Sequence, residues 1–222
     1  MPLPPRQLAL ALEHPESYAR EDFLAGACNE AALKLIESWP DWPGNAVALV
    51  GPEGSGKSHL ASIWASLSGA RIVSGRSLER ADFMAALATA ALVIEEAAAA
   101  DERALLHLLN LAREEEAFLL FTTRTPPAAW RVAIADLASR LRALPLVTLK
   151  PPDDAMLRGV IVKLAADRQL ALDEAVVRYL SMRIERSFAA ARAAIVALDG
   201  EALRRGRPAN RALAAELFRD ES

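Results

Sequence analysis

The fold of this chain is decided by the stretch Gly51-Pro52-Glu53-Gly54-Ser55-Gly56-Lys57-Ser58. It matches the pattern G-x-x-x-x-G-K-[ST], and it follows a short apolar run and precedes residues at helical spacing. Glycines let the backbone curl so that consecutive N–H groups point at phosphate oxygens, and the N-terminus of the next helix adds a positive dipole. The alternative is a glycine-rich turn with a surface lysine. The flanking pattern favours a phosphate-binding loop, or P-loop.

The residue types of the P-loop predict roles at a bound nucleotide. Lys57 is expected to bind the β- and γ-phosphates, and the Ser58 hydroxyl is expected to coordinate Mg²⁺. His59 continues the loop into the following helix and completes the predicted nucleotide-binding set without a role of its own.

Residues suited to hydrolysis follow two later apolar runs. Glu95 and Glu96 follow Leu92-Val93-Ile94, and we expect Glu95 to hold Mg²⁺ and Glu96 to orient or deprotonate water. Thr123 follows the run 119–122 and is a candidate to contact the γ-phosphate or its water, because ligands lie beyond the carboxyl ends of strands in nucleotide-binding sheets. The alternatives are solvated carboxylates and a simple strand end.

Around the P-loop, short apolar runs alternate with helical patterns from residue 20 to residue 151. Strands are expected at residues 47–50, 70–73, 91–94, 119–122 and 146–149. Helices are expected between them, for example at 101–115. Short apolar strands that alternate with helices predict a parallel sheet covered on both faces.

After Pro151-Pro152 the strand signals stop. Helices are expected after the capping residues Asp153, Asp173 and Ser187 and after Pro208. The predicted fold class is therefore α/β: a P-loop domain (18–150) with a parallel sheet flanked by helices, followed by a small all-α domain (151–222). Prolines and an alternating apolar stretch mark residues 1–17 as an extended N-terminal tail.

Composition excludes several classes of protein. Apolar residues make up 53% and charged residues 25% of the 222 residues, which is a globular balance, and a net charge of -3 gives no pervasive basic face for nucleic acid. The single cysteine, Cys28, excludes an intramolecular disulfide framework and a multi-cysteine zinc site. The longest apolar run, 83–94, is too short for a membrane helix, and no secretory signal is evident. We therefore expect a cytoplasmic protein with no membrane partner.

Together these pieces resemble the DnaA-related branch of the AAA+ ATPases, from about residue 18 to residue 218. Four segments carry the resemblance: Arg20-Glu21-Asp22-Phe23-Leu24 with Asn29 is similar to the adenine-wrapping segment, 122–127 to sensor 1, Asp136-Leu137-Ala138-Ser139-Arg140-Leu141 to the arginine-finger box, and Pro151-Pro152-Asp153-Asp154 to the start of the lid domain. The resemblance implies an AAA+ P-loop domain with a small all-α lid, which binds ADP or ATP with Mg²⁺.

The resemblance also implies a role for Arg140 at a neighbouring subunit's nucleotide. There a guanidinium stabilises the charge on the transferring γ-phosphoryl group, which is worth about 10³–10⁵ in rate for arginine fingers. From the residues alone, a helix-end arginine in a surface salt bridge is the favoured description of Arg140, and it is the Ser139-Arg140 box of the resemblance that favours the finger.

Within the branch, two features of this sequence resemble those of a regulator that inactivates the replication initiator DnaA. No helix-turn-helix pattern follows the lid, and the tail carries Gln7-Leu8-x-Leu10-x-Leu12, which is similar to a sliding-clamp-binding peptide. The side chains of Gln7, Leu8, Leu10 and Leu12 are expected to bind the clamp. The expected partners are then the DNA polymerase sliding clamp and DnaA, with homo-oligomerisation as a further expectation and only indirect or weak DNA contact.

Three departures from the branch pattern concern the hydrolysis machinery. Glu95 stands in place of the usual Asp, and Arg124 stands where the branch carries an acidic residue. The sensor-2 arginine aligns with Ala189, and Arg186 and Arg192 are both candidates to replace it because each lies about one helical turn away. We therefore predict a protein that holds nucleotide well and hydrolyses it slowly by itself.

Two other functions are compatible with a P-loop. A helicase-loader-like ATPase would bind single-stranded DNA, but the net charge and the lack of an aromatic–basic strip disfavour it. A small-molecule kinase would need an acceptor site, and none is evident. Turnover discriminates them, because a kinase consumes ATP with its acceptor whereas the regulator should be slow alone.

Overall fold

A computed structural model describes residues 18–218 of the chain. These residues form two compact units, one from Tyr18 to Pro151 and one that begins at Pro152. The predicted clamp-binding residues Gln7, Leu8, Leu10 and Leu12 lie outside the described residues.

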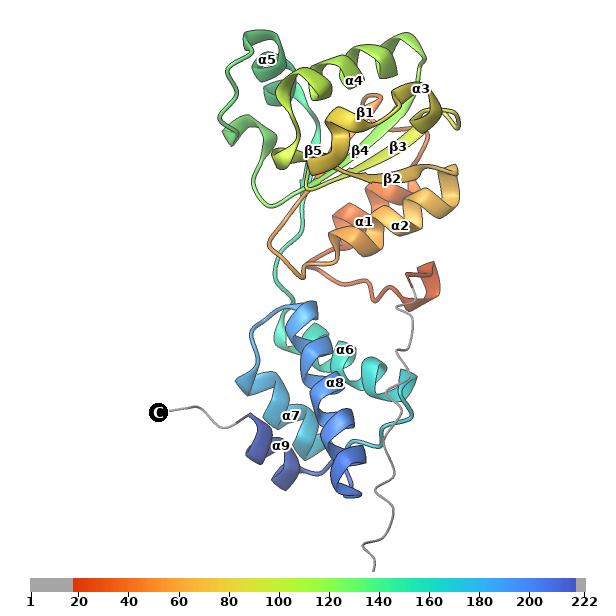
Figure 1. Ribbon diagram of the computed structural model, residues 1–222. Helices are drawn as coiled ribbons and strands as arrows, with labels where there is room; N and C mark the ends of the chain where they lie inside the picture. Colours follow the sequence, from red (N-terminus) through yellow and green to blue (C-terminus); the bar gives the residue numbers. More distant parts are fainter. Residues whose placement is uncertain (1–17, 219–222) are drawn as a thin grey trace, which may run out of the picture. The chain divides into compact units, whose positions relative to one another are not determined.

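The first unit is built on a five-stranded sheet with the order β2-β3-β4-β1-β5, and every strand pair in it is parallel. The strands are β1 (Ala46–Val50), β2 (Arg71–Ser74), β3 (Ala91–Glu95), β4 (Phe118–Thr123) and β5 (Leu146–Thr148). Each lies within one residue of its predicted bounds. The parallel sheet flanked by helices is thus confirmed (Figure 1).

Helices cover both faces of the sheet, with α1 and α2 on one face and α4 on the other (Figure 1). The helices of this unit are α1 (Glu30–Glu37), α2 (Lys57–Ser68), α3 (Phe83–Ala86), α4 (Glu102–Glu114) and α5 (Ala135–Ala143). The short 3-10 turns are η1 (Arg20–Asp22), η2 (Gly75–Arg80), η3 (Ala97–Ala99) and η4 (Pro127–Ala129). The start of α4 is set by Asp101, whose carboxylate accepts hydrogen bonds from the N–H groups of Arg103 and Ala104.

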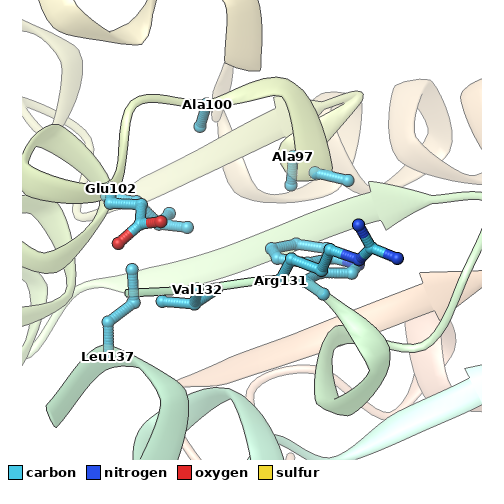
Figure 2. Close-up of a pocket in the computed structure, with 9 residues that line it drawn as sticks. Ala97, Ala100, Glu102, Arg131, Val132 and Leu137 are labelled. Atoms are coloured by element: carbon cyan, nitrogen blue, oxygen red, sulfur yellow. The ribbon is translucent and has the colours of Figure 1, made fainter. Parts of the chain in front are cut away.

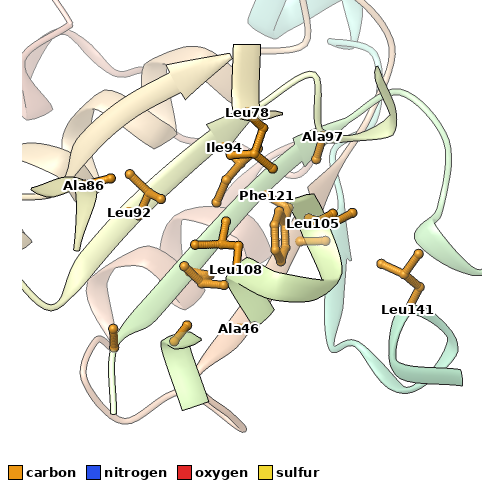
Figure 3. Close-up of a cluster of buried hydrophobic side chains, with 14 of the residues drawn as sticks. Ala46, Leu78, Ala86, Leu92, Ile94, Ala97, Leu105, Leu108, Phe121 and Leu141 are labelled. Carbon is orange, nitrogen blue, oxygen red and sulfur yellow. The ribbon is translucent and has the colours of Figure 1, made fainter. Parts of the chain in front are cut away.

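The period-2 alternation of the strands divides the core into two layers. Val47 and Leu49 of β1 pack with α1 and α2, whereas Ala46, Ala48 and Val50 belong to the opposite layer. In that layer, Leu92 and Ile94 of β3 and Phe121 of β4 pack with Leu105 and Leu108 of α4 (Figure 3). Because both faces of the sheet are covered, the strands read as continuous apolar runs in the sequence.

The second unit is helical throughout residues 154–217, apart from its connecting turns. It contains α6 (Asp154–Asp167), α7 (Glu174–Arg183), α8 (Phe188–Arg205) and α9 (Arg211–Leu217). The side chains of Asp153, Asp173, Ser187 and Asn210 each accept a hydrogen bond from the N–H three residues later and so begin the four helices. Residues such as Ile161, Leu180 and Ile195 bury fully in a core of this unit's own.

None of the helices within residues 18–218 has the length and apolar character needed to cross a membrane.

Candidate functional site

The P-loop connects the carboxyl end of β1 to the N-terminus of α2. Gly54 and Gly56 adopt positive φ angles of 68° and 94°, a conformation that glycine reaches without steric cost. At Gly51, an added Cβ would lie 2.8 Å from Ser55 Oγ and 3.0 Å from the Leu149 carbonyl oxygen, so the close packing of the loop requires glycine. The loop therefore curls as the sequence pattern predicts and presents its backbone at the start of a twelve-residue helix.

The Lys57 side chain lies across this loop. Its Nζ donates hydrogen bonds to the carbonyl oxygens of Gly51, at 2.8 Å, and Pro52, at 2.7 Å. Burial and then the positive charge of Arg124 lower the pKa of Lys57, while Glu53 and Glu95 raise it. The carboxylates of Glu53 in the P-loop and of Glu95 at the end of β3 are thus both close enough to Lys57 to affect its pKa. The P-loop and the end of β3 therefore lie near each other.

The sheet order explains why they meet. β1 pairs with β4, which places Val50 beside Thr123, and β4 pairs with β3, which places Phe121 beside Ile94. Because the strands are parallel, their carboxyl ends lie on one edge, and the P-loop, Thr123 and Glu95 follow each other along it. The structure therefore brings together the predicted P-loop, acid and threonine positions.

The hydroxyl of Thr123 has a local partner. Thr123 is buried, and its Oγ1 donates to the Thr125 carbonyl oxygen at 3.0 Å, which closes the turn after β4. Thr122 Oγ1, also buried, accepts from the N–H of Glu96 at 3.4 Å. The predicted contact of Thr123 with a γ-phosphate or its water stays a prediction. Thr122 helps to position the acidic end of β3 through its hydrogen bond with Glu96.

Glu96 is engaged by an arginine that the sequence did not indicate. Arg76 Nε lies 2.8 Å from Glu96 Oε2, and this hydrogen bond is the main cause of the lowered pKa of Glu96. Glu96 itself has a left-handed backbone, and a Cβ on Gly75 would lie 2.6 Å from its carbonyl oxygen. The segment after β2 thus packs closely on Glu96. A carboxylate with a lowered pKa is a weaker general base. The only sequence signal for Arg76 is that it follows Gly75 directly after a strand.

His59 anchors the segment that precedes α1. Its Nε2 donates to the Ala19 carbonyl oxygen at 2.9 Å, and its ring packs edge-on against Tyr18 and Phe23, with centroids 5.3 and 5.1 Å away. Asn29, which is buried, folds the same segment by bonding to Gly26 N–H and to the Leu24 carbonyl oxygen, each at 2.9 Å. His59 therefore has a structural role beside the P-loop that the sequence did not assign.

The oxygen donors at this edge fit a magnesium ion. Within residues 18–218 no group of three or more His, Cys, Asp or Glu side chains forms a metal cluster. Mg²⁺ in nucleotide sites takes only one or two protein ligands and completes its shell with phosphate and water. The exposed Ser58 hydroxyl and the Glu95 carboxylate are oxygen donors of that kind.

Arg140 lies on α5, whose buried residues Leu137 and Leu141 attach this helix to the core. Its Nε and Nη2 contact the two carboxylate oxygens of Asp136, one turn earlier, at 3.2 and 3.1 Å. The side chain keeps 32% of its surface exposed. In the isolated chain Arg140 therefore forms the salt bridge and keeps part of its side chain exposed, and its role at a partner's nucleotide stays a prediction.

A pocket of about 340 Å³ adjoins the same helix (Figure 2). Seven of its nine lining residues are of apolar types, and the lining comes from η3, Ala100, the start of α4, the segment after η4 and Leu137. Glu102 and Arg131 stand at opposite ends of it, with Val132 between them (Figure 2). The Glu102 carboxylate accepts from the N–H groups of Ala133 and Ile134 at 3.0 Å, so it fixes the start of α5.

The two candidate sensor-2 arginines differ in position. α8 begins at Phe188 with Ser187 as its cap, so Arg186 precedes the helix and the argument from helical neighbours does not apply to it. Arg186 Nη2 instead pairs with Asp154 at 2.8 Å. Arg192 lies within α8 and retains the predicted relation to Ala189.

Comparison with solved structures shows which known folds this chain resembles. Domain III of the Thermotoga maritima replication initiation protein DnaA matches with a TM-score of 0.77 and 18% identity, over 91% of this chain and 96% of that one. Replication initiator DnaA bound to AMPPCP and single-stranded DNA matches with a TM-score of 0.67 and 18% identity, over 85% of this chain and 68% of that one. The Thermotoga maritima RuvB Holliday junction branch migration motor matches with a TM-score of 0.72 and 19% identity, over 90% and 70%.

No family model matches the chain, and no curated protein matches it by sequence. The likeness to DnaA domain III covers 91% of the chain, more than either compact unit alone, so it extends over both units. The chain has the fold of the AAA+ ATPases, with a P-loop α/β unit followed by a helical unit.

Proposed function

We propose that this chain is an AAA+ regulator of the Hda type, which inactivates the replication initiator DnaA. In this proposal it binds ADP, docks on the DNA-loaded sliding clamp through its tail, and offers Arg140 to the ATP bound by DnaA. The observation that carries the proposal is the accessible Arg140 on α5 in a chain that matches DnaA domain III over nearly its whole length. The resemblance to the DnaA-related branch implies that this arginine of one subunit reaches the nucleotide of a neighbouring one.

Nucleotide binding is supported by the P-loop. Its left-handed glycines, the helix N-terminus and Lys57 supply the backbone donors and the charge that a polyphosphate needs. One of the comparison structures is DnaA bound to AMPPCP and single-stranded DNA, which agrees with nucleotide binding by a protein of this fold. Ser58 and Glu95 would hold Mg²⁺, which would supply charge neutralisation at the phosphates.

Slow hydrolysis by the chain itself is supported by the partners of its acidic and hydroxyl groups. Glu96 pairs with Arg76 and has a lowered pKa, so it is poorly suited to accept a proton from water. The Thr123 hydroxyl donates to Thr125. A protein that keeps its own nucleotide and acts on that of a partner is consistent with these contacts.

Action in trans is supported by the exposure of Arg140 on α5, where 32% of its side chain is accessible. Its ion pair with Asp136 is a weak helical pair, so a phosphoryl group can replace the carboxylate. The clamp contact belongs to Gln7, Leu8, Leu10 and Leu12, outside the described residues, and rests on the sequence pattern.

The test is DnaA-bound ATP hydrolysis in a single turnover, with and without this chain and with and without clamp loaded on DNA. We expect faster hydrolysis only when both the chain and the loaded clamp are present. Equal rates with and without the chain would overturn the proposal. Rapid ATP turnover by the chain alone, stimulated by single-stranded DNA or by a small acceptor, would instead support a helicase-loader-like ATPase or a kinase.

A further inference from the structure

A group of arginines gathers on the helical unit where α7 packs against α9 (Figure 1). Arg183 and Arg211 lie over the ring of Tyr179, with their guanidinium carbons 5.1 and 5.9 Å from its centroid. Two positive charges therefore lie beside the same aromatic ring. No such cluster is visible along the sequence, because Arg211 follows only after the whole of α8.

A pocket of about 450 Å³ adjoins this ring, and Arg178 and Arg211 both line it. Met182 also lines the pocket, one helical turn after Arg178, and it keeps 78% of its surface exposed. The α7–α9 patch, as we name it, consists of Arg178, Tyr179, Met182, Arg183 and Arg211. Its arginines and its methionine are exposed, so a ligand can reach them from solvent.

The α7–α9 patch is positive on a chain whose net charge is -3. Among the described residues that line the pocket, the one carboxylate is that of Glu174, which pairs with Arg178 at 2.8 Å. The side chains of Arg178 and Glu174 are 66% and 86% exposed, and an ion pair with this exposure is weak and readily exchanged. The patch therefore carries a surplus of positive charge, to which a polyanion is complementary.

The arrangement of the patch favours the phosphate backbone of DNA over other polyanions. Phosphate oxygens match the planar guanidinium fork, and duplex DNA presents its charges more densely than a peptide presents carboxylates. Guanidinium groups lie over the Tyr179 ring, so a base that stacked on this ring would have to displace them. Contact with phosphates therefore suits the patch better than stacking of single-stranded bases.

We propose that the α7–α9 patch binds the phosphate backbone of duplex DNA, a contact that carries no sequence information. On the proposed function, the tail holds the chain on a clamp that encircles DNA. The patch would then meet that DNA at a high effective concentration, so a weak contact is sufficient. The patch uses neither the P-loop nor Arg140, and the proposal is therefore tested separately from the action on DnaA.

The test is binding of the full chain to a short, fluorescently labelled DNA duplex at several salt concentrations, followed by anisotropy. Each phosphate contact contributes about −0.9 to the slope of log K against log salt, so three arginines predict a slope of about −2.7. Joint replacement of Arg183 and Arg211 by Ala should bring the slope to about −0.9. The affinity ratio between 50 and 200 mM salt should then be about 10-fold smaller than for the wild type.

Met182 provides matched variants, because it is exposed and its replacement leaves the core of the helical unit intact. Met182→Glu should weaken duplex binding, whereas Met182→Lys should strengthen it and steepen the slope by about 0.9. Met182→Gln should bind like the wild type. Equal losses in Met182→Gln and Met182→Glu would identify a pocket for an apolar side chain and would overturn the proposal.

Arg158→Ala is the control for net charge, because it removes an exposed arginine from α6 of the same unit, outside the pocket lining. It should bind duplex DNA like the wild type. A slope that the double variant leaves unchanged would overturn the proposal, as would a wild type with no salt-dependent binding. Tighter binding of a single strand than of a duplex of the same length would also contradict it.

Two further outcomes separate this proposal from the proposed function. If the patch variants bind duplex DNA like the wild type but lose the stimulation of DnaA, the patch binds a protein and the DNA assignment fails. If the wild type binds duplex DNA through the patch but does not stimulate DnaA, only the proposed function fails. Circular dichroism of each variant confirms that the fold is retained.

Discussion

Replacing Arg140 by Ala separates a small effect on stability from a large effect on a partner's chemistry. The substitution removes an i,i+4 ion pair with Asp136, whose side chain is 56% exposed. Such a helical pair contributes about 0.3–0.5 kcal/mol, which corresponds to a fall in Tm of about 1–2 °C for a chain of this size. Loss of an arginine finger costs about 10³–10⁵ in rate, or about 4–7 kcal/mol at the transition state.

The assay is single-turnover hydrolysis of ATP bound to DnaA, with clamp loaded on DNA and with wild-type or variant chain. Arg140→Ala should keep its fold, its ADP affinity and its clamp binding, because the charge matters only where phosphoryl charge develops. It should lose most of the stimulation. Arg140→Lys should recover little, since an ammonium lacks the planar fork.

Arg142→Ala is the matched control, because Arg142 is an exposed arginine two positions further along the same helix and so faces another direction. It should stimulate DnaA like the wild type. If Arg140→Ala also stimulates DnaA like the wild type, the action of Arg140 in trans is refuted. If both variants lose stimulation equally, a general basic surface of α5 is responsible instead of a finger.

Three further predictions address the P-loop, the tail and the helical unit. Lys57→Ala should weaken ADP binding by about 1.5–3 kcal/mol, because it removes a charged phosphate donor, and calorimetry that shows unchanged affinity would contradict the role of Lys57. Joint replacement of Gln7 and Leu8 by Ala should abolish clamp pull-down and leave ADP binding intact, whereas clamp binding that survives deletion of residues 1–14 would exclude the tail. The pKa of Glu201 is lowered to about 2, mainly by a hydrogen bond from Arg204. The ionised carboxylate therefore stabilises the fold fully above about pH 4.5, and this stabilisation is lost as the pH falls towards 2. Glu201→Gln should therefore lower the Tm at pH 7 and differ progressively less from the wild type on acidification, and a Tm difference that is constant with pH would contradict this.

Local structure was predictable from short stretches of sequence. The strand bounds and the caps at Asp153, Asp173 and Ser187 follow from apolar patterns in the sequence and from hydrogen bonds that span three positions. The P-loop is equally local, since its glycines and Lys57 act within eight consecutive residues. The pairing of Arg140 with Asp136 also lies within one helical turn.

The sequence by itself therefore determined the α/β class, the P-loop and the position of the helical unit. Tertiary structure alone decided which distant side chains meet around the P-loop. These contacts are Arg76 with Glu96, Arg124 with Glu53, and His59 with Tyr18 and Phe23. These contacts depend on the strand order β2-β3-β4-β1-β5 and on the packing of the segment before α1 over α2. A repeating apolar pattern shows that a strand is buried but does not specify its neighbours, because side-chain burial is nearly the same for every central position in a covered parallel sheet.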